Sequence, residues 1–255
     1  MSIYSSILQN KKSGRKSFAV LVDPDKTKPR SCEALAQQAQ QSEFDFIFVG
    51  SSLLTSDNLD SCIRILKKNC NIPVVLFPGS TMQISAEADA ILLLSLISGR
   101  NAEMLIGKQV IAAPLLRVSQ LEIISTGYML VDPGHPTSVS YMSNTTPIPH
   151  DKNDVALCTA LAGEQLGLKL IFMDAGSGAR VPVNKPMIEA VSQAISIPLI
   201  TGGGIKTPEK ALENCYAGAD IIVAGNSIEK NQQLIAELSD AIHSFLPTDR
   251  VGQAT

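Results

Sequence analysis

The segment 197–229, IPLITGGGIKTPEKALENCYAGADIIVAGNSIE, contains two strand–turn–helix patterns in tandem. In the first pattern, the apolar run Ile197–Ile200 is followed by the glycines Gly202–Gly204 and then by a helical stretch. In the second, the apolar run Ile221–Ala224 is followed by Gly225–Asn226 and a further helical stretch. Strands that alternate with helices in this way are typical of a parallel sheet.

Glycine-rich turns of this kind suit an anion, because the bare backbone can approach it closely. Backbone N–H groups and the positive end of a following helix dipole then favour a phosphate. In a (β/α)8 barrel, the loops after the seventh and eighth strands hold a phosphate. One such turn alone often only separates two elements, but two in succession near the end of the chain predict a phosphate site.

The whole chain repeats this alternation of strands and helices. Its short apolar runs are continuous, as expected for strands that are buried on both faces. The expected strands are Ser17–Val22, Phe44–Val49, Pro73–Phe77, Ile91–Leu96, one within Glu122–Val131, Lys169–Met173, Ile197–Ile200 and Ile221–Ala224. A doubly wound open sheet is the competing fold, but no GxGxxG pattern follows the first run. We therefore predict an α/β fold, a (β/α)8 TIM barrel, as a single domain over residues 1–255.

Helices are expected between most of these strands. They are Ser31–Gln41, Ser56–Lys68, Asn101–Ala112, Asp151–Leu166, Val183–Ala194, a helix from Thr207 to about Ala217, and Glu229–Phe245. After the third strand and its turn, the residues TMQISAEADA lead directly to the fourth strand. A crossover that contains a helix needs roughly a dozen residues or more. The third helix of the barrel is therefore expected to be missing or reduced.

A long polar segment, His135–His150, follows the fifth strand and has no helical or strand periodicity. Such a loop is long for a barrel connection, so it is a candidate lid or binding loop.

Composition excludes several classes of protein. The net charge is −3 and the basic residues are scattered, which argues against nucleic acid as the main partner. The longest apolar stretch, Ala88–Ile97, is too short to span a bilayer, and the amino terminus has no apolar core of the signal-peptide type. A cytoplasmic location is expected. The five cysteines are widely spaced without a CxxC pair, so we expect reduced and partly buried thiols.

In a barrel, the residues just past each strand meet at one end. Oxygen donors follow the first strands, with Asp23 and Asp25 after one and Ser51 and Ser52 after the next. Carboxylate and hydroxyl oxygens suit Mg²⁺, which keeps waters and bridges to substrate phosphates. An Asp-Pro-Asp sequence suits a turn or a helix cap as well as a metal site, and Gly-Ser-Ser is more often a tight turn than a ligand. Two anion positions, one of them assisted by a metal, fit a transferase that joins a phosphorylated small molecule to a diphosphate.

Several motifs in fixed order closely resemble the geranylgeranylglyceryl phosphate synthase family, which includes the PcrB-type heptaprenylglyceryl phosphate synthases. These motifs are LVDPDK (21–26), FVGSS (48–52), FPGS (77–80), GYMLVDPGHPTSVS (127–140), DAGSGA (174–179), TGGGIKTPE (201–209) and VAGNSIE (223–229). The similarity runs from about residue 17 to residue 245. The fuller loops resemble the longer-chain group of that family, which is found in archaea and some bacteria.

The resemblance implies a prenyltransferase that joins sn-glycerol 1-phosphate to geranylgeranyl diphosphate with Mg²⁺ and releases diphosphate. It also implies a barrel without its third helix. Matched to the family motifs, Asp23 and Ser52 are the metal positions and Asp174 is the catalytic residue. The positions that would bind sn-glycerol 1-phosphate are Phe172, Met173, Asp174, Ala175, Gly176, Ser177, Gly178, Gly203, Gly204, Gly225 and Asn226.

The sequence departs from the family pattern at one point. The family commonly has Tyr-Leu-Glu, where the glutamate orients or deprotonates the attacking hydroxyl, and this chain has Phe172-Met173-Asp174. Asp174 keeps the carboxylate but is one methylene shorter, and Phe172 lacks the phenol.

Two other functions stay open at this point. The first is another phosphate-binding barrel enzyme, such as a sugar-phosphate isomerase or lyase, and the second is a non-catalytic barrel that binds a phosphorylated metabolite. The family further implies a homo-oligomer, either a dimer or a hexamer. A lipid product implies a transient contact with a membrane surface. The prenyl groove is expected to be lined by residues of the second to fourth strands and the short link.

Overall fold

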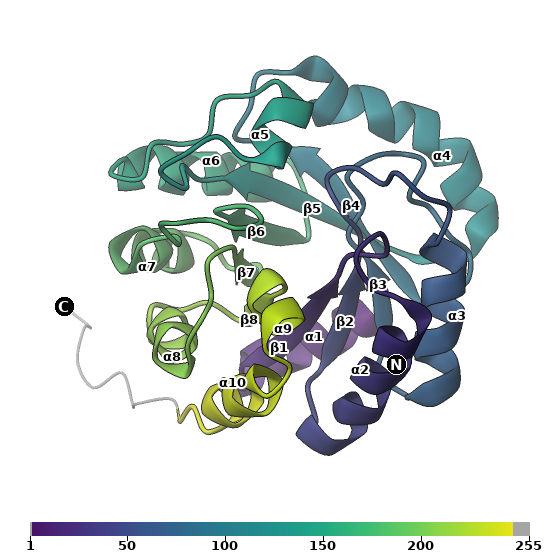
Figure 1. Cartoon of the computed structure of the whole chain (residues 1–255). Coiled ribbons are helices and arrows are strands. Elements are labelled where there is room, and N and C mark those ends of the chain that lie inside the picture. The colour runs from purple at the N-terminus through teal and green to yellow at the C-terminus, as the bar shows by residue number, and fades with distance from the viewer. Residues whose placement is uncertain (1, 247–255) are drawn as a thin grey trace.

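The computed structural model describes residues 2–246 and forms a closed barrel of eight parallel strands in sequential order. Pairing of β1 with β8 closes the barrel (Figure 1). The strands are β1 Ser17–Val22, β2 Phe46–Val49, β3 Val74–Leu76, β4 Ala90–Leu96, β5 Glu122–Leu130, β6 Leu170–Asp174, β7 Leu199–Gly202 and β8 Ile221–Ala224. The predicted TIM barrel is therefore confirmed.

Helices surround the barrel. The main ones are α2 Pro29–Ser42, α3 Leu59–Asn69, α4 Lys108–Ser119, α6 Asn153–Gln165, α7 Lys185–Ala194, α8 Pro208–Tyr216 and α10 Leu234–His243. In the described chain β4 follows β3 without an intervening helix, as the short link predicted. The remaining helices are α1 Ile3–Ser13, the π-helix η1 Glu103–Gly107, α5 Ser138–Ser143 and α9 Asn226–Lys230.

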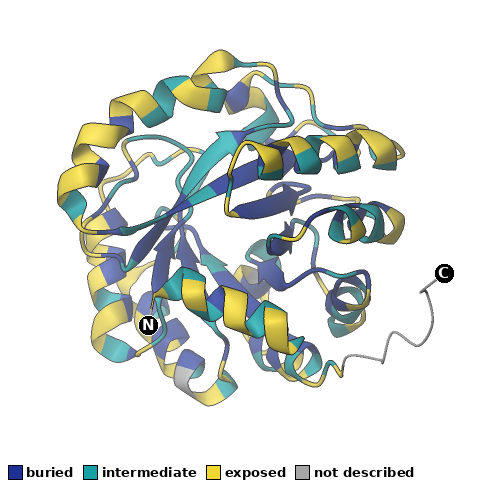
Figure 2. Ribbon diagram, turned by 180° about the vertical axis from the view of Figure 1, so that it is seen from behind, coloured by how far each residue is buried: buried dark blue, intermediate teal, exposed yellow. Residues whose placement is uncertain are grey.

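The strands are buried on both faces, whereas each outer helix buries only one side (Figure 2). One cluster of buried side chains fills the barrel interior and includes Phe48, Tyr128 and Phe172. A second cluster lies between the strands and the helices and includes Ile63 and Met173. Because successive residues of a strand point to opposite faces, both sides of each strand must be apolar. This explains the continuous apolar runs in the sequence.

The amino-terminal helix α1 covers the end of the barrel where the strands begin. Ser2 caps it, and the carboxylate of Glu122 accepts the N–H groups of Ile3 at 2.6 Å and Tyr4 at 2.9 Å. Ile7 is buried with the residues of the barrel interior. The sequence analysis did not predict this helix. Its partners lie in β5 and beside β6, so only the tertiary fold shows why it forms.

Several predicted boundaries were wrong. Helix α4 continues beyond Ala112 to Ser119 with Pro114 inside it, although proline normally ends a helix. Proline has no N–H for the carbonyl of Val110, and Val110 is exposed, so water can satisfy that carbonyl. The segment after β8 contains two helices, α9 and α10, instead of one helix from Glu229. The polar segment after β5 contains the short helix α5, which Thr137 caps.

All five cysteines are free, and four are buried, whereas Cys158 is exposed. Within residues 2–246, every helix is too short or too polar to cross a bilayer. The ends of the predicted domain, residue 1 and residues 247–255, lie outside the described chain.

Candidate active site

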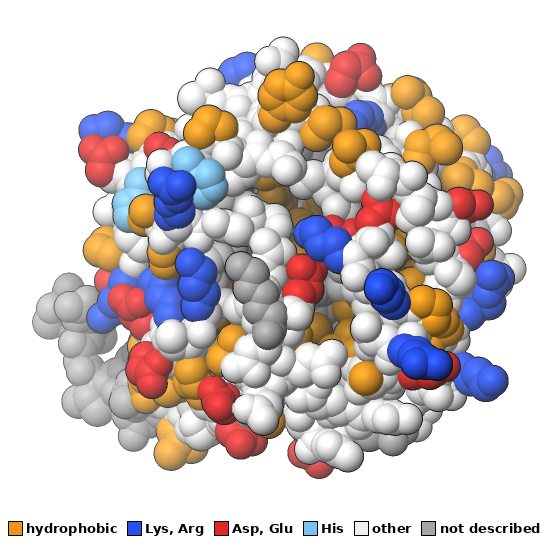
Figure 3. All heavy atoms as spheres, viewed as in Figure 1, with side chains coloured by type: hydrophobic (Ala, Val, Ile, Leu, Met, Phe, Trp, Pro, Cys, Tyr) orange, Lys and Arg blue, Asp and Glu red, His pale blue; other side chains and the backbone are white. Residues whose placement is uncertain are grey.

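A cavity of about 460 Å³ opens at the carboxyl ends of the strands. In Figure 3 this face is hollowed near its centre, and acidic and basic side chains lie beside the hollow. Polar groups that follow β1 and β2, including Asp23 and Ser52, line one part of it. Its apolar lining comes mainly from β4, the η1–α4 segment and α5. The apolar residues there are Ile91, Leu93, Leu94, Leu96, Met104, Ala112, Val139 and Met142.

A second and smaller cavity of about 70 Å³ adjoins the first. It is lined mostly by the turns after β6, β7 and β8, the phosphate end that the sequence predicted. The two cavities share six lining residues: Leu21, Phe77, Asp174, Ser177, Gly225 and Asn226. A small polar molecule and a long apolar molecule could therefore meet at this shared wall.

The turn after β7 requires its glycines. Gly203 and Gly204 have φ values of 81° and 76°, in the left-handed region that side chains disfavour. A Cβ atom on Gly203 would lie 2.7 Å from an oxygen of Asp174 and 2.7 Å from the backbone nitrogen of Gly176. Within the described chain, no acceptor meets the N–H groups of Gly203 and Gly204. These two donors are available to an anion.

The turns after β6 and β8 meet beside this glycine pair. The hydroxyl of Ser177 donates to the side-chain oxygen of Asn226 at 3.0 Å. Asn226 begins α9, a short extra helix between β8 and α10. Helix α8 begins only at Pro208 and has its own cap, Thr207, so its first turn is not part of this cluster. Loops after strands seven and eight with a short extra helix form the usual phosphate site of such barrels.

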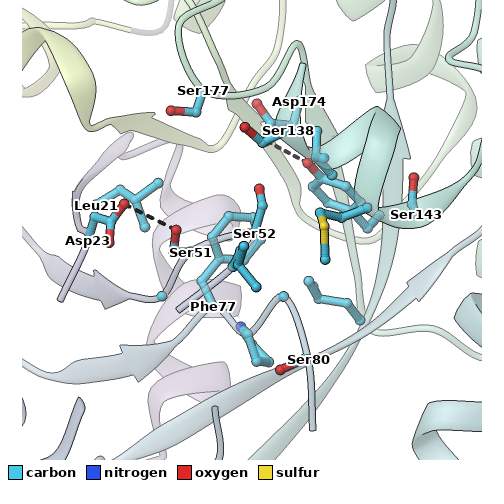
Figure 4. A pocket seen from close by; sticks show the side chains of 18 of the residues that line it. Leu21, Asp23, Ser51, Ser52, Phe77, Ser80, Ser138, Ser143, Asp174 and Ser177 are labelled. Carbon is cyan, nitrogen blue, oxygen red and sulfur yellow. Dashed lines mark hydrogen bonds between the residues drawn. The ribbon is translucent and has the colours of Figure 1, made fainter. Parts of the chain in front are cut away.

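Asp174 lies at the end of β6 and is 8% exposed. One carboxylate oxygen accepts the N–H of Gly176 at 2.7 Å, and the other accepts the hydroxyl of Tyr128 at 2.7 Å (Figure 4). Burial raises the pKa of Asp174, and these two hydrogen bonds oppose the rise. Burial and the nearby Asp174 likewise raise the pKa of Tyr128 well above its usual value, so Tyr128 stays protonated and can donate. A buried carboxylate with a raised pKa is suited to accept a proton near neutral pH.

Three aromatic rings lie next to Asp174. Phe77 stacks on Phe172 with centroids 5.0 Å apart, and Tyr128 meets Phe172 edge-on at 5.6 Å and Phe77 at 5.8 Å. Phe172 lines the small cavity and Tyr128 the large one, while Phe77 lines both. This cluster separates the two cavities and fixes the position of the tyrosine.

Asp23 lies across the large cavity from Asp174 (Figure 4). It is 8% exposed, and its carboxylate contacts the ammonium of Lys26 at 2.9 Å and the hydroxyl of Ser51 at 3.1 Å. Among the described residues, no three histidine, cysteine or acidic side chains lie close enough together to hold a metal. A single carboxylate with nearby hydroxyls still fits Mg²⁺, because this ion usually keeps waters and takes further oxygens from substrate phosphates.

The loops after β2 and β3 are fixed to each other. The side-chain amide of Gln83 donates to the carbonyl of Ser51 at 2.7 Å and accepts from its N–H at 3.1 Å. Gly79 packs so closely against the same loop that an added Cβ atom would lie 2.3 Å from the carbonyl oxygen of Ser51. Ser52 lines the cavity beside this clamp.

The predicted substrate-binding residues fall into two groups. Asp174, Gly176, Ser177, Gly178, Gly203, Gly204, Gly225, Asn226 and Phe172 line the small cavity. Met173 and Ala175 are fully buried between the strands and the outer helices, because alternate residues of the strand point outward. Only their backbone can contribute to the site.

Two residues of the site, Tyr128 and Lys26, were not singled out from the sequence, and Ser51 was named as an oxygen donor without a role of its own. All three lie within motifs that the sequence analysis quoted, and Lys26 and Ser51 stand next to Asp25 and Ser52, which it named. The signal for Tyr128 is a hydroxyl within an otherwise apolar strand, at an inward-facing position. That signal identifies an interior polar group but not its partner on another strand.

Comparison with known proteins agrees with this geometry. The family model described as PcrB matches residues 10–244. A protein of Chitinophaga pinensis named geranylgeranylglyceryl phosphate synthase is 56% identical over 245 residues, which cover 96% of this chain and 97% of that protein. A protein of Spirosoma linguale with the same name is 54% identical over 92% of this chain and 94% of its own length.

A solved structure shows the same fold. The crystal structure of (S)-3-O-geranylgeranylglyceryl phosphate synthase from Thermoplasma acidophilum, in complex with sn-glycerol 1-phosphate, has a TM-score of 0.91 and 34% identity, and the match covers 96% of this chain and 100% of that one. The fold, the two adjoining cavities and these matches lead to one conclusion: this chain belongs to the PcrB family.

Proposed function

We propose that this chain is a geranylgeranylglyceryl phosphate synthase. It transfers a geranylgeranyl group from the diphosphate to the 3-hydroxyl of sn-glycerol 1-phosphate and releases diphosphate. The observation that carries the proposal is the shared wall of the two cavities, where Asp174 lies between a small glycine-lined pocket and a larger pocket with an extensive apolar lining. High identity to synthases of this name over nearly the whole chain supports it.

The acceptor fits the small cavity. Its phosphate would meet the N–H groups of Gly203 and Gly204, and the turns at Ser177 and Asn226 would enclose it. The glycerol carbons would then extend toward Asp174, which borders both cavities. Fixing the phosphate in this way presents the far hydroxyl of the acceptor to the carboxylate.

In the reaction, the 3-hydroxyl oxygen forms a bond to carbon 1 of the prenyl chain while the bond from that carbon to the diphosphate oxygen breaks. The diphosphate leaves with the electron pair. The hydroxyl proton passes to the carboxylate of Asp174, whose raised pKa suits it to this role. Burial of the carboxylate limits its contact with water, which disfavours its charged form and raises its pKa.

The diphosphate would lie on the opposite side of the large cavity, at Asp23 and Ser52. These residues would hold Mg²⁺, which supplies positive charge to a diphosphate leaving group when it is bound. Lys26 contacts Asp23 at 2.9 Å and lines the same cavity, so its ammonium is within reach of the diphosphate. The prenyl tail would extend along the apolar lining from β4 to α5.

A turnover assay tests the proposal. Purified protein and Mg²⁺ would be offered sn-glycerol 1-phosphate or its mirror image with labelled farnesyl, geranylgeranyl or longer diphosphates. We expect product from the 1-phosphate alone, with preference for the four-isoprene donor. Absence of product with every donor, together with tight binding of the glycerol phosphate, would instead indicate a binding protein.

The metal positions have a separate test. Asp23→Asn should lose most Mg²⁺-dependent turnover, whereas Asp25→Asn should lose little, since Asp25 caps the loop through Thr55 and Ser56. Full activity of Asp23→Asn with Mg²⁺ would show that the metal assignment is wrong.

The assembly and location of the protein remain predictions. Helix α4 and its neighbour η1 expose several large apolar side chains: Ile106, Val110, Ile111, Leu115 and Val118. Such a strip suits contact with a second copy of the chain, and we propose a homo-oligomer, a dimer or a hexamer, of single-domain prenyltransferases. Light scattering on a size-exclusion column would give its mass. Cell fractionation would test the cytoplasmic location and the transient contact with a membrane surface.

A further inference from the structure

We infer that Tyr128 is a positioning residue for the reaction: its hydroxyl holds the Asp174 carboxylate in the orientation that takes the proton of the acceptor. The inference rests on the proposed function, in which Asp174 is the base. Nothing in the motif around Asp174 supplies this hydroxyl, because the tyrosine belongs to the neighbouring strand β5.

The barrel register brings the two side chains together. Tyr128 is level with Phe172 in the pairing of β5 with β6, and Leu130 is level with Asp174. Because paired residues of parallel strands point to the same face, Tyr128 and Asp174 both point into the barrel, one pleat apart. The tyrosine ring spans that offset, and its hydroxyl reaches the carboxylate at 2.7 Å.

The tyrosine is held rigidly, as a positioning residue requires. It is 5% exposed, and its ring is packed against the rings of Phe77 and Phe172. Gly202 makes room for this packing, since an added Cβ atom there would lie 3.0 Å from the ring of Phe172. Rigid packing fixes the direction from which the hydroxyl approaches Asp174.

Each oxygen of the Asp174 carboxylate accepts a hydrogen bond from a different part of the barrel. The N–H of Gly176 fixes one oxygen from the loop, and Tyr128 fixes the other from the opposite side. With both oxygens held, the carboxylate cannot rotate away from the cavities. The sequence has Phe172 and Asp174 where the family commonly has tyrosine and glutamate. In this chain, the hydroxyl that Phe172 lacks comes from Tyr128, and it reaches the shorter side chain of Asp174.

The charges around Asp174 favour this interpretation. Among the described residues, Tyr128 is the titratable group in hydrogen-bond contact with it. The other titratable groups of the large cavity come from the loop after β1, from α4 and from α9: Asp23, Asp25, Lys26, Lys108 and Glu229. The pKa of Asp174 is raised by burial and lowered by the Tyr128 hydroxyl and the Gly176 N–H, so these two donors are what sustain the ionised form.

The decisive experiment compares Tyr128→Phe with the wild-type enzyme in steady-state assays across pH. The variant keeps the ring and loses the hydroxyl. We expect kcat at neutral pH to fall about tenfold, the effect of one hydrogen bond to a charged group. The acid limb of the kcat profile should move to higher pH, because the ionised carboxylate loses a donor. The KM for glycerol phosphate should change by less than about threefold, since the phosphate is held elsewhere.

Tyr216→Phe is the matched control. It removes a phenolic hydroxyl from the outer helix α8, where Tyr216 is 56% exposed and its ring packs on Phe245. Its kinetics and pH profile should equal those of the wild type. A Tyr128→Phe enzyme with wild-type kcat and an unmoved acid limb would overturn the inference.

A double variant separates an effect through Asp174 from a general disturbance of the site. On an Asp174→Asn background, adding Tyr128→Phe should lower the residual rate by less than about twofold, because the group that it positions is already lost. An equal loss on both backgrounds would show that the tyrosine acts independently of Asp174, which contradicts the inference.

An NMR measurement tests the contact between Tyr128 and Asp174 even if the protein shows no turnover. Titration of the ¹³C-labelled Asp174 carboxyl by NMR needs no substrate. In Tyr128→Phe its midpoint should lie at higher pH than in the wild type, and in Tyr216→Phe it should be unchanged. Wild-type protein that lacks turnover but shows this shift would reject the proposed function and retain the pairing. Equal midpoints in all three proteins would reject the pairing itself.

Discussion

Two buried carboxylates, Asp174 and Asp220, lie at opposite ends of the barrel and are stabilised in different ways. Asp220 precedes β8, contacts the ammonium groups of Lys11 at 2.9 Å and Lys16 at 3.5 Å, and accepts the N–H of Leu199 at 2.9 Å. Asp174, at the end of β6, has hydrogen bonds but no ion pair among the described residues. The first is neutralised by cations, and the second keeps a raised pKa.

The pattern extends along the amino-terminal end. Asp45 accepts the N–H of Phe18 and pairs with Arg15, and Asp89 accepts the N–H of Val74 and pairs with Lys67. These carboxylates tie one strand to the next and satisfy backbone donors. At the amino-terminal end, carboxylates paired with cations contribute stability, whereas at the carboxyl end the proposed function uses the hydrogen-bonded carboxylate of Asp174 for reactivity.

The largest expected effect is on turnover at the carboxyl end. Asp174→Asn should lower kcat by about 10³-fold, because a general base is removed while the shape of the side chain is kept. Circular dichroism and the unfolding midpoint should show an intact fold. Rates within a few-fold of the wild type would show that Asp174 is not the reactive carboxylate.

The next effect concerns stability at the amino end. Asp220→Asn leaves the ammonium groups of Lys11 and Lys16 without their partner, and Lys16 is largely buried. We expect the free energy of unfolding in urea to fall by about 3 kcal/mol. The kcat of the folded fraction should stay unchanged. A stable variant with impaired kcat would reverse the roles assigned to the two ends.

A smaller effect tests the glycine turn. Gly203→Ala should lower the free energy of unfolding by about 2 kcal/mol, from left-handed strain plus contact with Asp174, and should weaken calorimetric binding of sn-glycerol 1-phosphate. Gly167→Ala is the matched control, since its φ is 86° with nothing within 4 Å of the added atom. Gly167→Ala should lower the free energy of unfolding by about 1 kcal/mol and leave the binding of sn-glycerol 1-phosphate unchanged. Equal behaviour of the two variants would mean that the close approach at Gly203 has no role in binding.

The smallest expected effect is the pH dependence of stability. Because the pKa of Asp174 is raised in the folded state, the folded protein keeps a proton that the unfolded chain has lost. This contribution is fully present below the unfolded pKa of about 3.9 and is lost as pH rises through the folded pKa. As the pH rises from about 3.9 through the folded pKa, the free energy of unfolding of the wild type should therefore fall relative to that of Asp174→Asn. Parallel urea titrations of both proteins would measure the difference, and curves that stay parallel would argue against a raised pKa.

The barrel and the glycine turns at its carboxyl end could be predicted from the amino-acid sequence alone. Strands buried on both faces must be continuous apolar runs, and a turn such as Gly203–Gly204 needs backbone angles that side chains disfavour. The missing third helix followed from chain length alone, since the link before β4 is too short for a crossover with a helix. These features depend on local composition and spacing, so they can be read along the chain.

Which groups meet at the site could not be predicted from the sequence, because it depends on the tertiary structure. Tyr128 and Asp174 are 46 positions apart, and the hydrogen bond between them depends on the register of β5 against β6. Similarly, the hydroxyl that contacts Asp23 belongs to Ser51, and helix α1 forms against Glu122, far along the chain. Strand register and loop packing set these contacts, and both arise from the whole core instead of from neighbouring residues.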